Sequence, residues 1–225
     1  MRIAIVGCGY VADYYMKTLT NHPDLELVGV TDRDAARLQK FSKFHHAPTF
    51  PSVASVLDDP RVELVLNLTN PKSHYAITKA LLEAGKHVYS EKPLSLRFAE
   101  AEELVALAEA RGLELGGAPC SLLGEAAQTV WKALREERIG KVRVVYAELD
   151  DGPVHLMGSE KWRSDSGNPW PRKDEFEVGC TLEHAGYYVA WLVGFFGPAK
   201  TVTSFAAVTI VSSRKHPPPR LTAKK

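Results

Sequence analysis

Apolar and polar positions follow two alternating patterns in the first half of the chain. Short runs rich in Val, Ile and Leu are typical of buried strands, and they alternate with longer stretches whose apolar residues recur every three or four positions, as in amphipathic helices. The predicted strands are 2–6, 25–31, 63–68, 87–90 and 113–117. The predicted helices are 11–21, 34–44, 51–57, one that follows a loop at 69–74 and ends at Gly85, and 96–111. This alternation predicts an α/β fold with a doubly wound parallel sheet of the Rossmann type over residues 1–118.

The pattern changes after residue 118. An amphipathic helix is predicted from Leu123 to near Gly140, and long strands are predicted at 141–149 and 200–211. Between them, 150–178 has few apolar residues and reads as a long loop, which either lines a substrate pocket or is a solvated excursion. The helix predicted at 179–196 is apolar nearly all round, so we expect it to be buried. The basic, Pro-rich tail at 212–225 is expected to be disordered.

The turn after the first strand carries a phosphate-binding pattern. Gly7-x-Gly9-x-x-Ala12 follows the strand and opens the helix, which gives a sharp turn, bare backbone near a pyrophosphate, and close packing of helix on strand. Asp32 ends the second strand at the distance expected of an acid that holds a ribose diol. Thr69 and Lys92 follow two further strands, so all of these residues should converge on one crevice at the carboxyl edge of the sheet.

Composition excludes several other classes of function. The net charge is +1 in 225 residues, which gives no basis for binding nucleic acid or an acidic membrane surface. No apolar run reaches the 18 or more residues of a membrane span. Cys8, Cys120 and Cys180 are widely spaced and odd in number, so we expect reduced thiols, a cytoplasmic protein and no metal site.

Five motifs together resemble the glucose-fructose oxidoreductase, inositol dehydrogenase and rhizopine-catabolism (Gfo/Idh/MocA) family of NAD(P)-dependent oxidoreductases. They are Gly7-x-Gly9-x-x-Ala12, Asp32, Asn70-Pro71-x-x-His74, Glu91-Lys92-Pro93, and Gly179…His184-x-Gly186-x-Tyr188, where many members read Gly-Gly…Asp-x-Gly-x-His. The resemblance implies a cofactor domain at 1–118 followed by an α+β domain with an open, mostly antiparallel sheet, and a substrate bound between the two. It also implies a cis peptide bond between Lys92 and Pro93.

The resemblance implies a hydride transfer between nicotinamide and a secondary alcohol of a sugar, polyol or similar small molecule. The implied catalytic residues are Lys92, Tyr188 and His184, with a Lys92–Tyr188 proton relay in which Lys92 lowers the pKa of Tyr188 and partial burial lowers that of Lys92. The expected cofactor-binding residues are Gly7, Gly9, Tyr10, Val11, Ala12, Asp32, Arg33, Thr69, Asn70, Pro71, His74, Glu91 and Lys92. Two alternatives stay open: a cofactor-binding regulator or scaffold on the same fold, and a glycosidase that uses NAD transiently.

Asp32 favours NAD(H), because its carboxylate would repel the 2′-phosphate of NADP(H); Arg33 and Thr31 leave NADP possible. Members of this family usually run to well over 300 residues, and only two long strands are predicted after residue 118. We therefore expect a C-terminally truncated chain whose domain at 119–211 is incomplete and which has little activity itself. The full-length form is expected to be a homo-oligomer.

Overall fold

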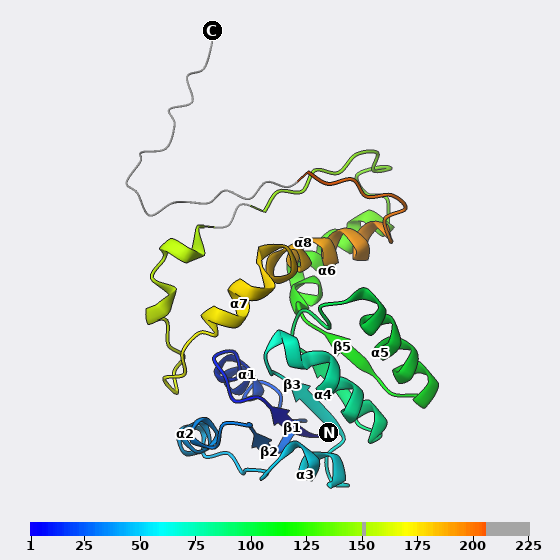
Figure 1. The fold of residues 1–225 in the computed structure, drawn as a ribbon. Coiled ribbons are helices and arrows are strands. Elements are labelled where there is room, and N and C mark those ends of the chain that lie inside the picture. Colours follow the sequence, from blue (N-terminus) through cyan, green and yellow to red (C-terminus); the bar gives the residue numbers. More distant parts are fainter. Residues whose placement is uncertain (150–151, 206–225) are drawn as a thin grey trace.

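Residues 2–117 form a five-stranded parallel sheet with helices on both faces (Figure 1). The structure, a computed structural model, describes residues 1–149 and 152–205. The strands are β1 (Arg2–Val6), β2 (Glu26–Thr31), β3 (Leu64–Asn67), β4 (His87–Ser90) and β5 (Leu115–Gly117). The helices are α1 (Ala12–Leu19), α2 (Ala35–His45), α3 (Val53–Asp58), α4 (Pro71–Glu83) and α5 (Phe98–Arg111). The predicted α/β fold and all five predicted strands are confirmed.

The strand order β2-β1-β3-β4-β5 contains one point at which the winding reverses. β1 pairs with β2 on one side and with β3 on the other, and the register sets Val6 beside both Thr31 and Asn67. The carboxyl ends of these three strands therefore lie next to one another. In open α/β sheets ligands bind in the crevice at this switch point, so the fold alone places a binding site beyond Val6.

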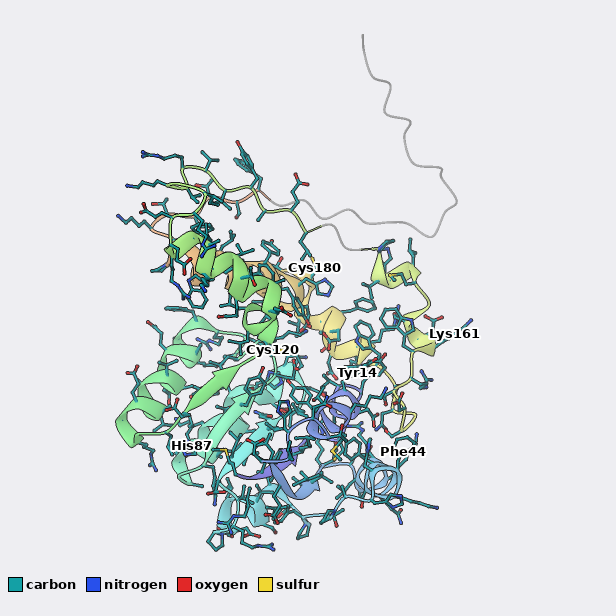
Figure 2. The ribbon with its side chains drawn as sticks, turned by 180° about the vertical axis from the view of Figure 1, so that it is seen from behind. Tyr14, Phe44, His87, Cys120, Lys161 and Cys180 are labelled. Atoms are coloured by element: carbon teal, nitrogen blue, oxygen red, sulfur yellow. The ribbon has the colours of Figure 1, made fainter. Side chains whose placement is uncertain are left out.

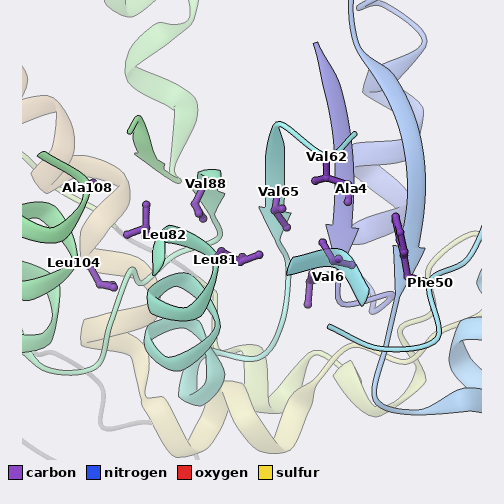
Figure 3. Packing of buried hydrophobic residues seen from close by; sticks show 11 residues of the cluster. Ala4, Val6, Phe50, Val62, Val65, Leu81, Leu82, Val88, Leu104 and Ala108 are labelled. Atoms are coloured by element: carbon purple, nitrogen blue, oxygen red, sulfur yellow. The ribbon is translucent and has the colours of Figure 1, made fainter. Parts of the chain in front are cut away.

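Alternate residues of the central strands supply two separate cores, one on each face of the sheet. Ala4 and Val6 face a cluster that contains Leu81 and Leu82 of α4 and Leu104 of α5 (Figure 3). Ile3 and Ile5 point the other way, into a cluster with Ala12 of α1 and Phe41 of α2. This burial on both faces explains why the strands read as continuous apolar runs.

The second half consists of helices and irregular chain. The elements are η1 (Cys120–Leu123), α6 (Glu125–Arg135), η2 (Val154–Leu156), η3 (Ser159–Lys161), α7 (Arg172–Val178) and α8 (Cys180–Phe196). Figure 1 shows α6, α7 and α8 gathered on one side of the sheet domain. No element in the described residues is long and apolar enough to cross a membrane as a helix.

Several predictions for the second half are wrong. Residues 141–149 form no strand and are exposed, as are the described residues 200–205 of the second predicted strand. A strand needs a hydrogen-bonding neighbour, and the described residues beyond 118 form a single isolated β-bridge, between Arg163 and Pro169. The antiparallel sheet is therefore not confirmed. The helix predicted at 179–196 forms as α8, but Glu183 is its one buried residue. The tail at 212–225 lies outside the described residues.

Polar contacts fasten the segment around Ser166 onto the first half. Asp13 of α1 is 2% exposed and accepts hydrogen bonds from the Ser166 hydroxyl at 2.7 Å and the Ser166 backbone N–H at 3.3 Å. His45 at the end of α2 also pairs with Asp13. The side-chain amide of Asn168 donates to the carbonyl oxygen of Cys8 at 2.9 Å. The long segment predicted as a loop is thus anchored next to the glycine turn.

Candidate cofactor and substrate site

The glycine turn after β1 has the shape that a phosphate site requires. Gly7 has a φ of +101°, and a Cβ there would lie 2.5 Å from the carbonyl oxygen of Leu68, so a larger residue would clash unless the backbone shifted. Gly9 has open space where its Cβ would be, which leaves room for a ligand against the backbone. Ala12 is fully buried where α1 packs on the sheet. These are the three roles expected of the motif, and they form a cradle that fits a pyrophosphate.

Asp32 at the end of β2 is held in place by its neighbours. Its carboxylate accepts from the backbone N–H of Cys8 at 2.8 Å and of Asp34 at 2.8 Å, and Arg37 of α2 lies 3.5 Å away. Asp32, Arg33 and Arg37 line one small cavity of about 110 Å³ with Gly7 and Gly9. An acid and two guanidinium groups therefore meet where the motif would place the adenosine ribose, so both cofactor variants have a candidate partner there.

The loop after β3 differs in one respect from the prediction. α4 begins at Pro71, so His74 lies within the helix rather than in a loop before it. The ring of His74 is 1% exposed, with Nδ1 2.6 Å from the carbonyl oxygen of Pro93 and Nε2 2.8 Å from that of Thr69. The imidazole thus joins the loop after β3 to the loop after β4. Asn70 is engaged as well, because its amide donates to Asp174 of α7 at 2.6 Å.

The loop after β4 carries Glu91, Lys92 and Pro93, with the Lys92–Pro93 peptide bond cis as predicted. Glu91 is fixed by two hydrogen bonds. It accepts from the hydroxyl of Tyr15 at 2.8 Å and from the backbone N–H of Lys92 at 3.0 Å. Both contacts orient the loop so that the Lys92 side chain extends toward α8.

Lys92 forms an ion pair with Glu183 of α8, a residue that is 3% exposed. Burial alone would lower the pKa of Lys92, but the hydrogen bond to Glu183 and the nearby carboxylates, chiefly Glu175, raise the pKa above its usual value. The predicted lowering of the Lys92 pKa is therefore wrong. The amine is an ammonium group at neutral pH, and it can donate a hydrogen bond to an oxygen in the cavity.

One cavity of about 330 Å³ joins the glycine turn to this ion pair. Tyr187 of α8 lines it, and the Lys92 Nζ lies 5.8 Å from the centre of the Tyr187 ring. Burial raises the pKa of Tyr187, although Lys92 opposes the shift. Tyr14, labelled in Figure 2, lines the same cavity from α1. The remaining lining residues include Gly9, Tyr10, Val11, Thr69, Asn70, Pro71, His74, Glu91, Trp170 and Glu175.

The residues of α8 in the cavity differ from those predicted. His184 and Tyr188 line a separate cavity with Leu149 and Phe176, whereas Glu183 and Tyr187 lie near Lys92. Each pair is spaced i, i+4 and so shares a helix face, but a shift of one residue turns the helix by about 100°. The tyrosine of α8 that lies beside Lys92 is therefore Tyr187 and not the predicted Tyr188.

The one-residue shift of the motif on α8 could have been found from the sequence. When the family pattern Asp-x-Gly-x-His is read one residue earlier, it becomes Glu183-x-Ala185-x-Tyr187, which keeps an acid at the first position and a small residue at the third. The predicted alignment kept Gly186 as the glycine and had to accept a His in place of the acid. Keeping the acid would have found both residues near Lys92.

A glycine turn, an acid at the end of the next strand and a lysine at the end of β4, all on one crevice, define a dinucleotide-binding Rossmann protein with a second functional group beside the cofactor cradle. Residues 1–116 match the model of the oxidoreductase family with an NAD-binding Rossmann fold. The chain belongs to this family, the Gfo/Idh/MocA family that its motifs resemble.

The alignments with known relatives span a larger share of this chain than of each relative. It is 31% identical over 171 residues to trans-1,2-dihydrobenzene-1,2-diol dehydrogenase of Sus scrofa, which is 75% of this chain and 51% of the relative. Biliverdin reductase from Synechocystis, solved with biliverdin and NADP+, matches at 33% identity and a TM-score of 0.52 over 61% of this chain and 42% of that one. The WlbA dehydrogenase from Chromobacterium violaceum, solved with NADH and UDP-GlcNAcA, has a TM-score of 0.68 at 24% identity over 88% and 56%. The chain spans about half the length of the curated relatives that it matches.

Proposed function

We propose that this protein is an NAD(P)-dependent oxidoreductase that acts on a secondary alcohol, or the corresponding ketone, of a sugar, polyol or related diol. The observation that carries the proposal is the Lys92 ammonium, which shares one cavity with the cofactor cradle and with Tyr187. Two relatives support this substrate class: one is named as a diol dehydrogenase, and the other is a dehydrogenase solved with a bound sugar nucleotide.

Each group of the crevice has a separate task. Gly7 and Gly9 let a pyrophosphate approach the start of α1, and Asp32 and the two arginines hold the ribose. When bound, the nicotinamide supplies or accepts the hydride. The protein must position the substrate oxygen and manage its proton, and we assign these tasks to Lys92 and Tyr187, two neighbouring polar groups of the cavity.

The raised pKa of Lys92 sets the expected pH dependence. In reduction, the ammonium donates a proton to the carbonyl oxygen as the hydride reaches the carbon, which leaves an alcohol and a neutral amine. In oxidation, the neutral amine takes the hydroxyl proton as the hydride leaves, so it must form first. We therefore expect oxidation to accelerate as the pH rises and reduction to slow.

Titration with NADH and NADPH, followed by a screen of diols, polyols and sugars by absorbance of the reduced nicotinamide, tests the activity. The preference for NAD(H) remains a prediction, and tighter binding of NADPH would overturn it. Cofactor binding without turnover of any substrate would favour a regulator. Release of sugar from an aryl glycoside without net NADH would favour a glycosidase.

Substitutions then test the assigned residues. In a form of the protein that shows turnover, Lys92→Ala should lower turnover at least about a hundredfold, the lower range for general acid–base catalysis, and change cofactor affinity far less. Tyr187→Phe should also lower turnover, whereas Tyr188→Phe, on the next position of α8, serves as its matched control. Normal turnover by Lys92→Ala would refute the proposed role of the lysine.

A further inference from the structure

Three carboxyl groups lie near one positive charge, the Lys92 ammonium. Glu91 follows β4, Glu175 belongs to α7 and Glu183 to α8, and both Glu91 and Glu175 line the cavity. Glu91 is satisfied, because its two oxygens accept from Tyr15 and from the Lys92 backbone. Glu175 and Glu183 remain, and the charge of Lys92 can compensate only one of them.

The Glu183 carboxyl is incompletely satisfied as a carboxylate. Its Oε2 pairs with Lys92, but its Oε1 is buried and has no donor among the described residues. A buried acceptor without a donor destabilises the folded state. Glu175 lines the same cavity as Lys92, on the helix α7 that packs against α8, and a side-chain hydrogen bond with Glu183 is among the causes that raise the pKa of Glu175. Two carboxylates cannot bond to each other, whereas a carboxyl group can donate to a carboxylate.

We propose that Glu175 and Glu183 share one proton, and that Glu175, which carries it, is a positioning residue that aligns the Glu183 carboxylate with Lys92. The shared proton supplies the missing donor to Oε1 and removes one negative charge from the cavity. Burial raises the pKa of Glu175 to about 8, and the hydrogen bond and negative charge of Glu183 act in the same direction. The role in turnover rests on the proposed function; the shared proton does not.

None of the other titratable groups described in the cavity donates a hydrogen bond to Oε1 of Glu183. On α7 itself, Asp174 accepts from Asn70 and Glu177 pairs with Lys72 of α4. Lys92 favours the ionised form of Glu175, and Glu91 opposes it. The remaining titratable or charged lining residues are Tyr10 of the glycine turn, Tyr14 of α1, Arg37 of α2, His74 of α4 and Tyr187 of α8.

Carbon NMR of protein labelled in the glutamate carboxyl groups tests the shared proton without any need for activity. We expect one glutamate to titrate with a midpoint near pH 8, and we expect that titration to be absent in Glu175→Gln. Glu177→Gln, two residues along the same helix and exposed, is the matched control and should retain it. The proposal fails if every glutamate of the wild type titrates in the ordinary range, or if the high titration persists in Glu175→Gln.

Unfolding by urea supplies a second measurement. The folded state should bind more protons than the unfolded state between about pH 4.5 and 8, so the free energy of unfolding should fall as the pH rises through that window. Glu175→Gln should remove this decrease and Glu177→Gln should not. An unchanged pH dependence in Glu175→Gln would contradict the proposal.

Turnover tests the positioning role. Glu175→Gln keeps a donor for Glu183, so its kcat should stay within about twofold of wild type, while Glu175→Ala removes the donor and should lower kcat about tenfold with a smaller change in KM. The amide cannot ionise, so any loss of wild-type activity from ionisation of Glu175 should be absent in Glu175→Gln. Equal kcat values for the two variants would refute the positioning role. If the NMR titration is present but wild type shows neither cofactor binding nor turnover, the proposed function fails and the shared proton stands.

Discussion

Residues 1–117, the first region, and residues 118–205, the second region, are held in place by different interactions. In the first region the apolar side chains of the central strands are buried between helices on both faces of the sheet. Among the described residues of the second region, the buried ones are nearly all polar: Ala127, Ser159, Ser164, Ser166, Asn168 and Glu183. Composition does not explain the contrast, because α8 is strongly apolar and yet exposes Leu182, Val189 and Val193.

The contrast shows that an apolar sequence yields a core only where another layer covers it. The first region supplies both layers itself, since each of β1 to β4 is followed by a helix that packs back on the sheet. The second region is positioned through polar contacts to the first, such as Lys92 with Glu183 and Ser166 with Asp13. The site therefore depends on groups from a region that contributes little apolar burial of its own.

The largest expected effect compares two leucines, one from each region. Leu81 of α4 is fully buried, and Leu81→Ala should lower the free energy of unfolding by about 2–5 kcal/mol, because it removes apolar contacts and leaves a cavity. Leu182 of α8 is 43% exposed, and Leu182→Ala should change the free energy of unfolding by less than about 0.5 kcal/mol. Urea denaturation measures both. Equal losses of unfolding free energy in the two variants would show that the second region has an apolar core that stabilises it as much as the core of the first region.

A somewhat smaller effect compares two glycines of positive φ within the first region. Gly7→Ala combines backbone strain with a clash against Leu68, and we expect a loss of about 2–4 kcal/mol together with weaker cofactor binding. Gly85 has a φ of +77° and open space around it, so Gly85→Ala should cost only the strain, about 1–2 kcal/mol. If both variants lost the same stability, the close approach of β1 and β3 would not explain the glycine at position 7.

The sequence predicts the first region well because its determinants are local. Each strand and helix carries its own periodicity, and the glycine motif, Asp32 and the lysine after β4 stand at strand ends, which a parallel sheet brings together. Helix starts are less certain: α4 begins at Pro71, since proline suits the first helical turn, and this places His74 inside a helix.

The sequence predicts the second region poorly because its structure depends on distant partners. The residues at 141–149 have the composition of a strand, but strands form by pairing. The contact of Asp13 with Ser166 spans 153 positions and leaves no periodic signal. On α8 the error was a single residue, which is enough to exchange Glu183 and Tyr187 for His184 and Tyr188 because a helix rotates by about 100° per residue.

The smallest expected effect tests the link between the two regions. Burial disfavours the ionised form of Asp13, but hydrogen bonds from Ser164, His45 and Ser166 outweigh it and lower the pKa of Asp13 below its usual value. Asp13→Asn removes the charge from these bonds, and we expect a loss of about 1–3 kcal/mol and faster tryptic cleavage at Arg163. Asp165→Asn is the matched control, because Asp165 lies next to Ser166 but forms an exposed pair with Lys17. Its cleavage rate should resemble that of wild type.

The pH dependence of the free energy of unfolding separates the effect of the Asp13 charge from the effect of its hydrogen-bonding geometry. A carboxyl group whose pKa is lowered by folding stabilises the folded state above its unfolded pKa, here about 3.8, and this contribution is lost as the pH falls through the folded pKa. Wild type and Asp165→Asn should therefore lose an increment of stability below about pH 4 that Asp13→Asn lacks. Tryptic cleavage at neutral pH and urea denaturation across the acid range measure the two parts. If Asp13→Asn kept the acid-range loss and the wild-type cleavage rate, the second region would be held to the first by contacts other than this buried carboxylate.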